Sequence, residues 1–176
     1  MNHPVLKYLF LPFSLLYGLV VFFRNKLYDL EILPSEEFDL PIISVGNITV
    51  GGTGKTPHTE YLVQLLNNDF RVAVLSRGYK RKTRGFILAG EKDNASTIGD
   101  EPYQMYRKFP GIHVAVDEKR RRGIKKLSRL TNPPDVIILD DAFQHRSVNP
   151  GLSILLMDYN RLPNRDLLLP AGQLRE

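Results

Sequence analysis

A glycine-rich segment, Thr49-Val-Gly-Gly-Thr-Gly-Lys-Thr56, carries residue types that bind phosphate groups. Its glycines open the backbone so that N–H groups can point at anionic oxygens, Lys55 can reach the outer phosphates, and the Thr56 hydroxyl can bind Mg²⁺. An apolar run at residues 40–45 precedes it and an amphipathic stretch from residue 57 follows. This order of strand, loop and helix predicts a nucleotide-binding phosphate loop made of Thr49, Val50, Gly51, Gly52, Thr53, Gly54, Lys55 and Thr56.

The segment departs at one position from the pattern G-x-x-x-x-G-K-[ST], because Thr49 stands where the first glycine is expected. Threonine is tolerable there if the backbone at that position does not need a positive φ angle, which glycine alone adopts at no steric cost.

A second candidate group follows the apolar run at residues 136–139, which ends in Asp140. An aspartate at the end of a strand is usually a helix cap or a turn former, but beside a phosphate loop it is predicted to be the second ligand of Mg²⁺. Asp141 adds a negative charge that only a cation would favour. Gln144 and His145 come next, and whether this histidine is a structural hydrogen-bonding group or a base stays open.

The segment Gly99-Asp-Glu-Pro102 places two carboxylates just before a predicted helix. The simpler interpretation is helix capping, since acidic side chains are favoured near the positive end of a helix dipole. The functional alternative is a base that accepts the proton of a substrate hydroxyl.

From residue 40 onward, short runs rich in Val, Ile and Leu alternate with helical segments. This pattern predicts an α/β fold, a phosphate-loop NTPase-like and mostly parallel sheet with helices on both faces. Ligands of such sheets bind at the carboxyl ends of the strands, where the candidate segments lie. The predicted strands are residues 42–45, 71–76, 113–116, 136–139 and 152–157, and the predicted helices are 57–66, 101–108 and 118–127.

The amino-terminal part contains an uncharged, strongly apolar run at residues 8–23, which Pro12 is expected to interrupt. Sixteen residues fall just short of the roughly 18 to 20 that cross a bilayer squarely, so an in-plane helix and a spanning helix both fit. A buried core helix and a cleaved signal peptide are the alternatives. We expect a membrane-anchor helix at residues 1–28, a connector at 29–39 and a nucleotide-binding domain at 40–176.

Composition narrows the possible chemistry. The 176 residues include no cysteine, which excludes disulfides, zinc-thiolate sites and cysteine nucleophiles. The formal net charge is +5, and basic clusters lie at residues 80–84 and 119–126. These clusters are predicted to be solvated faces that can also attract anionic lipid. Aromatic residues are not interleaved with them, so no nucleic-acid partner is expected.

Five segments occur in the order and spacing of the tetraacyldisaccharide 4′-kinase family, which the sequence resembles along its whole length. Ala142 stands where that family often has glycine, and members continue well beyond the position of Glu176. The five segments are Gly46-Asn-Ile-Thr-Val-Gly-Gly-Thr-Gly-Lys-Thr-Pro57, Leu75-Ser-Arg-Gly-Tyr79, Gly99-Asp-Glu-Pro102, Leu139-Asp-Asp-Ala-Phe-Gln-His-Arg146 and Leu169-Pro-Ala-Gly-Gln-Leu-Arg-Glu176.

The resemblance implies a kinase that uses ATP and Mg²⁺ to phosphorylate the 4′ hydroxyl of a tetraacyldisaccharide 1-phosphate. Its product would be lipid IVA, an intermediate of lipid A biosynthesis, made on the cytoplasmic face of the bacterial inner membrane. By this resemblance Asp100 is the base and acts with Lys55 and Asp141, while Thr56 and Asp140 hold the metal. The residues expected to line the substrate region are Gln144, His145, Arg175 and Glu176.

The resemblance also implies a carboxy-terminal domain, not included in residues 1–176, that supplies a histidine partner for Asp100. We therefore expect residues 1–176 alone to show no lipid kinase turnover. The alternative function is that of a membrane-associated ATPase or switch acting on a protein partner.

Overall fold

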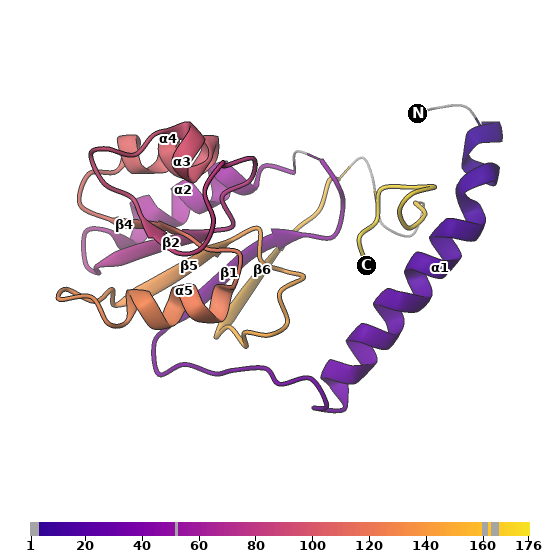
Figure 1. Ribbon diagram of the computed structural model, residues 1–176, viewed down its shortest axis with the longest axis horizontal. Coiled ribbons are helices and arrows are strands. Elements are labelled where there is room, and N and C mark those ends of the chain that lie inside the picture. Colours follow the sequence, from indigo (N-terminus) through magenta and orange to yellow (C-terminus); the bar gives the residue numbers. More distant parts are fainter. Residues whose placement is uncertain (1–3, 52, 160–161, 163–165) are drawn as a thin grey trace.

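The computed structural model describes residues 4–51, 53–159, 162 and 166–176, so Gly52 of the predicted phosphate loop lies outside the described residues. Its centre is a six-stranded sheet in the order β3-β4-β2-β5-β1-β6 (Figure 1). The strands are β1 (Ile42–Asn47), β2 (Val72–Ser76), β3 (Ile87–Leu88), β4 (His113–Val116), β5 (Val136–Asp140) and β6 (Leu152–Leu156). The helices are α1 (Pro4–Asp29), α2 (Lys55–Leu66), α3 (Ala95–Ile98), α4 (Asp100–Lys108) and α5 (Arg120–Leu127).

The predicted α/β architecture is confirmed. Five strands pair in parallel with their neighbours, in the order β4, β2, β5, β1 and β6, and within the described sheet only β3 pairs antiparallel. Strand β3 and helix α3 were not predicted from the sequence, because they are two and four residues long and too short to show a periodic pattern. The helix predicted at residues 101–108 begins one residue earlier, at Asp100. Both acidic residues therefore belong to its first turn.

Alternate side chains of the central strands pack on opposite faces of the sheet, as the two-residue repeat of a strand requires. In β5, Ile137 and Leu139 face the side that α5 covers, while Ile138 faces the side of α2 and α4. Figure 1 shows α2, α3 and α4 on one side of the sheet and α5 on the other. Because apolar residues are buried on both faces, the central strands are the continuous apolar runs seen in the sequence.

Strand register brings two candidate segments together. Strand β1 lies between β5 and β6, and Val45 is the register partner of Asp140. Both strands run in the same direction, so the chain leaves β1 into the glycine-rich loop beside the point where it leaves β5 into Asp141.

Helix α1 differs from the other helices in its exposure. It runs without interruption through Pro12, so the expected break is wrong, although a proline removes one N–H donor and crowds the preceding turn of a helix. Residues 8–29 are long and apolar enough to cross a membrane, and only 6% of the most apolar part is buried. Within the described residues, α1 is therefore not buried in the core.

We predict that truncation of the core on the α5 side destabilises the protein strongly. Leu75 is fully buried in β2 against α5, so Leu75→Ala should lower the free energy of unfolding by about 2 to 5 kcal/mol. The same change at Leu65, which is 58% exposed on α2, should alter it by less than about 0.5 kcal/mol. Urea unfolding of the purified protein in detergent measures both values, and equal effects would contradict the assignment of the core.

Candidate active site

The glycine-rich loop has the backbone geometry of an anion-binding turn. Gly51 and Gly54 have φ angles of +132° and +78°, a region that disfavours side chains. Thr49 is not among the described residues with positive φ, so the condition for replacing glycine at this position is met. Helix α2 begins directly at Lys55, and Gly54 provides no side-chain cap. The first N–H groups of α2 are therefore available to a ligand at the positive end of the helix.

Two amides tie this loop to the segment after β5. The Asn47 side chain donates from Nδ2 to the Thr53 hydroxyl at 2.8 Å. Gln144 in turn donates from Nε2 to the main-chain carbonyl of Asn47 at 2.7 Å. Gly46 permits this close approach, since a Cβ there would lie 2.6 Å from the Cβ of Phe143. Gln144, predicted to line the substrate region, thus holds the end of β1 in place.

Two other residues predicted from the sequence, Lys55 and Arg175, lie next to Asp141. Its carboxylate oxygen Oδ1 lies 3.6 Å from Lys55 Nζ and 3.4 Å from Arg175 Nη1. Asp141 has a φ angle of +49°, so the chain turns sharply after β5. Such left-handed backbone is uncommon outside glycine, although aspartate tolerates it better than most residues. The turn gives Lys55 an anionic partner at the mouth of the loop.

Asp140 is in a different environment from its neighbour. Its side chain is buried at the end of β5, and the Thr59 hydroxyl donates to its Oδ1 at 3.4 Å. Burial, followed by the nearby carboxylates of Glu101 and Asp141, raises the pKa of Asp140 to about 6, against the opposing charges of Arg120 and Lys55. An added cation would stabilise the ionised carboxylate.

Arg120 supports Asp140 from the opposite side of the sheet. It is buried, donating from Nη1 to the carbonyl of Asp117 at 2.7 Å and from Nη2 to the carbonyl of Asp140 at 3.1 Å. Burial lowers the pKa of Arg120 to about 10, so it remains charged at neutral pH. The prediction of a solvated basic cluster at residues 119–126 is therefore wrong for Arg120. No local pattern distinguishes it from exposed Lys119 beside it.

The two acidic residues of the Gly-Asp-Glu-Pro segment lie in the first turn of α4, and both are exposed. The predicted cap does not form as a side-chain hydrogen bond, because the N-cap position is Gly99. The favourable position near the positive end of the helix dipole remains. Since Glu101 is one of the charges that raise the pKa of Asp140, this turn lies at the same edge of the sheet as the acidic pair.

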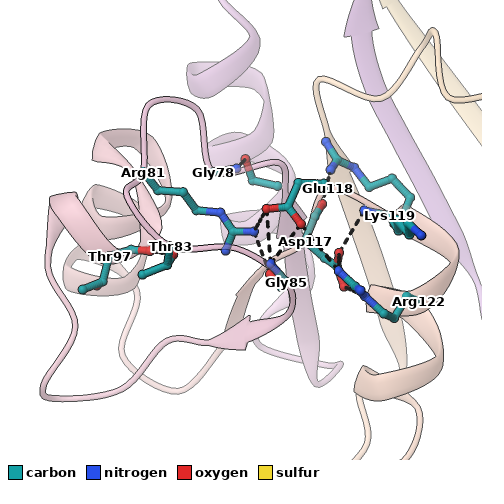
Figure 2. Close-up of polar contacts among 11 residues, drawn as sticks. Gly78, Arg81, Thr83, Gly85, Thr97, Asp117, Glu118, Lys119 and Arg122 are labelled. Carbon is teal, nitrogen blue, oxygen red and sulfur yellow. Dashed lines mark hydrogen bonds and ion pairs between the residues drawn. The ribbon is translucent and has the colours of Figure 1, made fainter.

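An ionic network fixes the loop that supports this turn (Figure 2). The Arg81 guanidinium pairs with Glu118 and donates to the Gly85 carbonyl at 2.6 Å, while the Gly85 amide donates to Glu118 Oε2 at 3.0 Å. The loop fixed in this way contacts Gly99, where a Cβ would lie 3.0 Å from the Tyr79 carbonyl. The network therefore positions the start of α4. The Arg81 side chain is nearly inaccessible, so the expected solvated face at residues 80–84 is wrong for Arg81, while Lys80, Lys82 and Arg84 are exposed.

The same network continues to the start of α5. Asp117, fully buried at the end of β4, accepts from the Lys119 amide at 2.8 Å and pairs with Arg122 at 2.7 Å. Figure 2 shows these contacts beside the Arg81 pair. Arg122 thus has a carboxylate partner in the fold, and the basic cluster at residues 119–126 is partly neutralised.

The remaining predicted residues are spread around this centre. Burial and the positive charges of Arg120 and Arg77 lower the pKa of His145 to about 4, so its imidazole is neutral at pH 7. Glu176 pairs with Arg24 of α1. The structure thus brings Lys55, Asp141 and Arg175 into direct contact, and it puts Glu176 against the amino-terminal helix.

The side chains at this edge of the sheet suit a Mg²⁺ ion that a bound ligand helps to coordinate. They suit less well a metal ion that is coordinated by protein side chains alone. Within the described residues no three His, Asp or Glu side chains cluster closely enough to hold a metal ion. Mg²⁺ in nucleotide sites is bound by one or two protein oxygens together with phosphates and water. A hydroxyl at Thr56 and the buried carboxylate of Asp140 fit that requirement.

Comparisons with known proteins agree on one family. A family model described as Tetraacyldisaccharide-1-P 4'-kinase matches residues 6–176. The tetraacyldisaccharide 4′-kinase of Parabacteroides distasonis is 64% identical over 167 residues, covering 94% of this chain and 45% of that protein. The corresponding protein of Porphyromonas gingivalis is 54% identical over 178 residues and covers 100% of this chain and 50% of its own length.

A solved structure of LpxK from Aquifex aeolicus in complex with ATP superposes with a TM-score of 0.88. It is 45% identical in sequence, and the match covers 97% of this chain and 54% of that chain. The chain thus spans about half the length of the curated relatives it matches.

We predict that the ionised side chain of Asp140 lowers the stability of the ligand-free protein at neutral pH. Its carboxyl has a pKa of about 6 when folded and an ordinary value of 3.8, so stability is lost as pH rises between these values. Asp140→Asn removes the ionisation and should raise the free energy of unfolding at pH 7.5 by about 1 to 3 kcal/mol, with little difference from wild type at pH 4. Urea unfolding without nucleotide or Mg²⁺ measures this.

The matched control is Asp135→Asn, which should have the opposite sign. Arg71 donates hydrogen bonds to this carboxylate and lowers the pKa of Asp135 to about 2, so ionised Asp135 stabilises the fold above about pH 4. Asp135→Asn should therefore destabilise the protein at pH 7.5. A destabilised Asp140→Asn protein at the same pH would contradict our account of Asp140.

Proposed function

The chain belongs to the tetraacyldisaccharide-1-P 4′-kinase family, and we propose that it provides the nucleotide-binding part of an ATP-dependent lipid kinase. The substrate is the 4′ hydroxyl of a tetraacyldisaccharide 1-phosphate, and the product is lipid IVA of lipid A biosynthesis. The family match over residues 6–176 carries this proposal. The close match to a solved structure in complex with ATP supports the choice of nucleotide.

The phosphate loop binds and orients ATP in this proposal. The loop from Thr49 to Thr56 and the first turn of α2 direct N–H groups toward the phosphates, and Lys55 neutralises charge on the transferring group. Mg²⁺, when bound, would offset negative charge between the phosphates, with Thr56 and Asp140 as its protein ligands. Asp141 supports the reaction by holding Lys55 and Arg175 at the mouth of the loop, at 3.6 and 3.4 Å.

Asp100 is the base for the acceptor. The 4′ oxygen bonds to the γ-phosphorus while the bridging oxygen leaves with its electron pair on ADP, and the hydroxyl proton passes to the Asp100 carboxylate. Support for this role comes from its exposure in the first turn of α4. The neighbouring Glu101 lies close enough to Asp140 to raise its pKa. His145, neutral at pH 7, and Gln144, Arg175 and Glu176 border the substrate region.

The membrane is the place of the reaction in this proposal. Residues 1–28 anchor the protein at the cytoplasmic face of the bacterial inner membrane, and residues 40–176 bind the nucleotide. Residues 29–39 connect these two parts. Support comes from the exposed apolar side chains of α1, which include Phe13, Leu16, Leu19 and Phe22. A four-chain lipid is costly to extract into water, so a kinase in the membrane plane avoids that step.

The proposed activity is tested with the full-length protein encoded by the gene that carries this sequence. It is incubated with Mg²⁺, ATP labelled at the γ position and tetraacyldisaccharide 1-phosphate in mixed micelles. Label transferred to the 4′ position of the lipid supports the kinase. Release of inorganic phosphate without lipid labelling would overturn it in favour of an ATPase or switch protein.

We predict that Lys55→Ala lowers turnover at least about 10²-fold in this assay, because a preorganised positive charge at the transferring phosphoryl group is lost. The control is Lys92→Ala, which removes an exposed lysine from the loop between β3 and α3. That variant should keep wild-type turnover. A Lys55→Ala protein within a few-fold of wild type would exclude this lysine from the chemistry.

A second prediction separates acceptor activation from nucleotide binding. Asp100→Asn should lower kcat at least about 10²-fold while the Kd for ATP changes less than about threefold, since a base acts on the hydroxyl and not on the nucleotide. Steady-state kinetics and calorimetric ATP titration give the two values. Glu91→Gln, at an exposed site, is the control. A parallel loss of ATP affinity would assign Asp100 to metal or nucleotide binding.

A further inference from the structure

Helix α1 contacts the rest of the protein along a narrow stripe. Ser14, Tyr17, Gly18 and Val21 are three or four residues apart and therefore share one face of the helix. Ser14 and Val21 are 4% and 8% exposed, whereas Phe13 beside them is 60% exposed. One face of α1 is thus packed on protein while the rest carries exposed apolar side chains.

The partner of this stripe is the carboxy-terminal segment, residues 167–176, which Figure 1 shows between the sheet and α1. The Ser14 hydroxyl donates to the Leu168 carbonyl and accepts from the Ala171 amide, both at 2.9 Å. The Tyr17 hydroxyl donates to the main-chain carbonyl of Arg175 at 2.9 Å. Helix α1 therefore bonds this segment at several points, and an ion pair between Arg24 and Glu176 extends the contact.

The other edge of the same segment pairs with the phosphate loop. The Arg175 amide donates to the Ile48 carbonyl at 2.7 Å, and the Val50 amide donates to the Gln173 carbonyl at 2.8 Å. These two bonds flank an antiparallel bridge between Thr49 and Leu174. The segment consequently joins α1 on one side to the start of the phosphate loop on the other.

Arg175 connects this segment to the reacting groups. Its main-chain carbonyl accepts from Tyr17, and its guanidinium pairs with Asp141, which also pairs with Lys55. A displacement of the Arg175 backbone would therefore shift the charge that faces Asp141 and, through it, the position of Lys55. Phosphoryl transfer depends strongly on such positioning, because little covalent help is available from the protein.

We propose that Tyr17 is a positioning residue for phosphoryl transfer: its hydroxyl holds the Arg175 backbone, so that α1 forms part of the scaffold of the active site as well as an anchor. This inference rests on the proposed function for its kinetic effect. Its structural part, the immobilisation of residues 167–176 by α1, is independent of the reaction.

The kinetic test uses Tyr17→Phe in the full-length protein, which removes one hydroxyl and keeps the ring. We expect kcat to fall about tenfold, the effect of one lost hydrogen bond, with KM for ATP and for lipid unchanged within about twofold. Tyr8→Phe is the matched control, since Tyr8 is on the same helix and 72% exposed. Both variants should sediment with phospholipid vesicles as wild type does.

A double mutant tests whether Tyr17 acts through Arg175. Tyr17→Phe should have no further effect on kcat when Arg175→Ala is already present, because the guanidinium that it positions is gone. A loss of the same size in both backgrounds would assign Tyr17 a general structural role and overturn the proposal.

Hydrogen exchange tests the inference without kinase activity. Amides of residues 167–176 should exchange at least about tenfold faster in Tyr17→Phe than in wild type or Tyr8→Phe, while the amides of β1 and β5 stay protected. Unchanged exchange in this segment overturns the inference, whatever the activity.

If wild type labels lipid and Tyr17→Phe has wild-type kcat, the positioning role fails and the proposed function stands. If wild type does not label lipid, the proposed function fails and the exchange result decides the structural part.

Discussion

The parallel register of β1 and β5 is the constraint on which the candidate site depends. Val45 lies opposite Asp140, so the glycine-rich loop and the acidic pair leave the sheet side by side. A shift of one residue in this pairing would reverse which side chains of β5 face the two layers of helices. The apolar residues on both faces of the sheet therefore fix the register, and the register places the phosphate loop against Asp140 and Asp141.

The acidic residues at this edge lower the stability of the protein without a ligand. Asp140 is a buried carboxylate whose pKa is raised by burial and by two neighbouring acids, and Asp141 has left-handed backbone. Buried Arg120 donates to the carbonyl of Asp140 and opposes this charge without a direct side-chain pair. Local departures of this kind are expected where a protein retains a binding site at the expense of its own stability.

Two supports outside the phosphate loop hold the site together. On the side of α5, the ion pair of Arg81 with Glu118 fixes the loop against which Gly99 and the start of α4 pack, and the ion pair of Arg122 with Asp117 holds the start of α5. On the side of α1, residues 167–176 pair with both the helix and the loop. The central groups are thus held between the sheet and a helix whose remaining surface is apolar and exposed.

The sequence alone was sufficient for features that depend on local pattern. Continuous apolar runs predicted the parallel strands, and the glycines with Lys55 predicted a loop that opens helix α2 after β1. The apolar run ending in Asp140 predicted the acidic end of β5, because strand alternation and helix periodicity are properties of neighbouring residues.

Only the tertiary structure decided that Arg120 is buried while Lys119 beside it is exposed. It alone brought Tyr17 to the carbonyl of Arg175, 158 positions away. Contacts between distant segments follow from how whole elements pack, and the pattern around either residue carries no information about its partner.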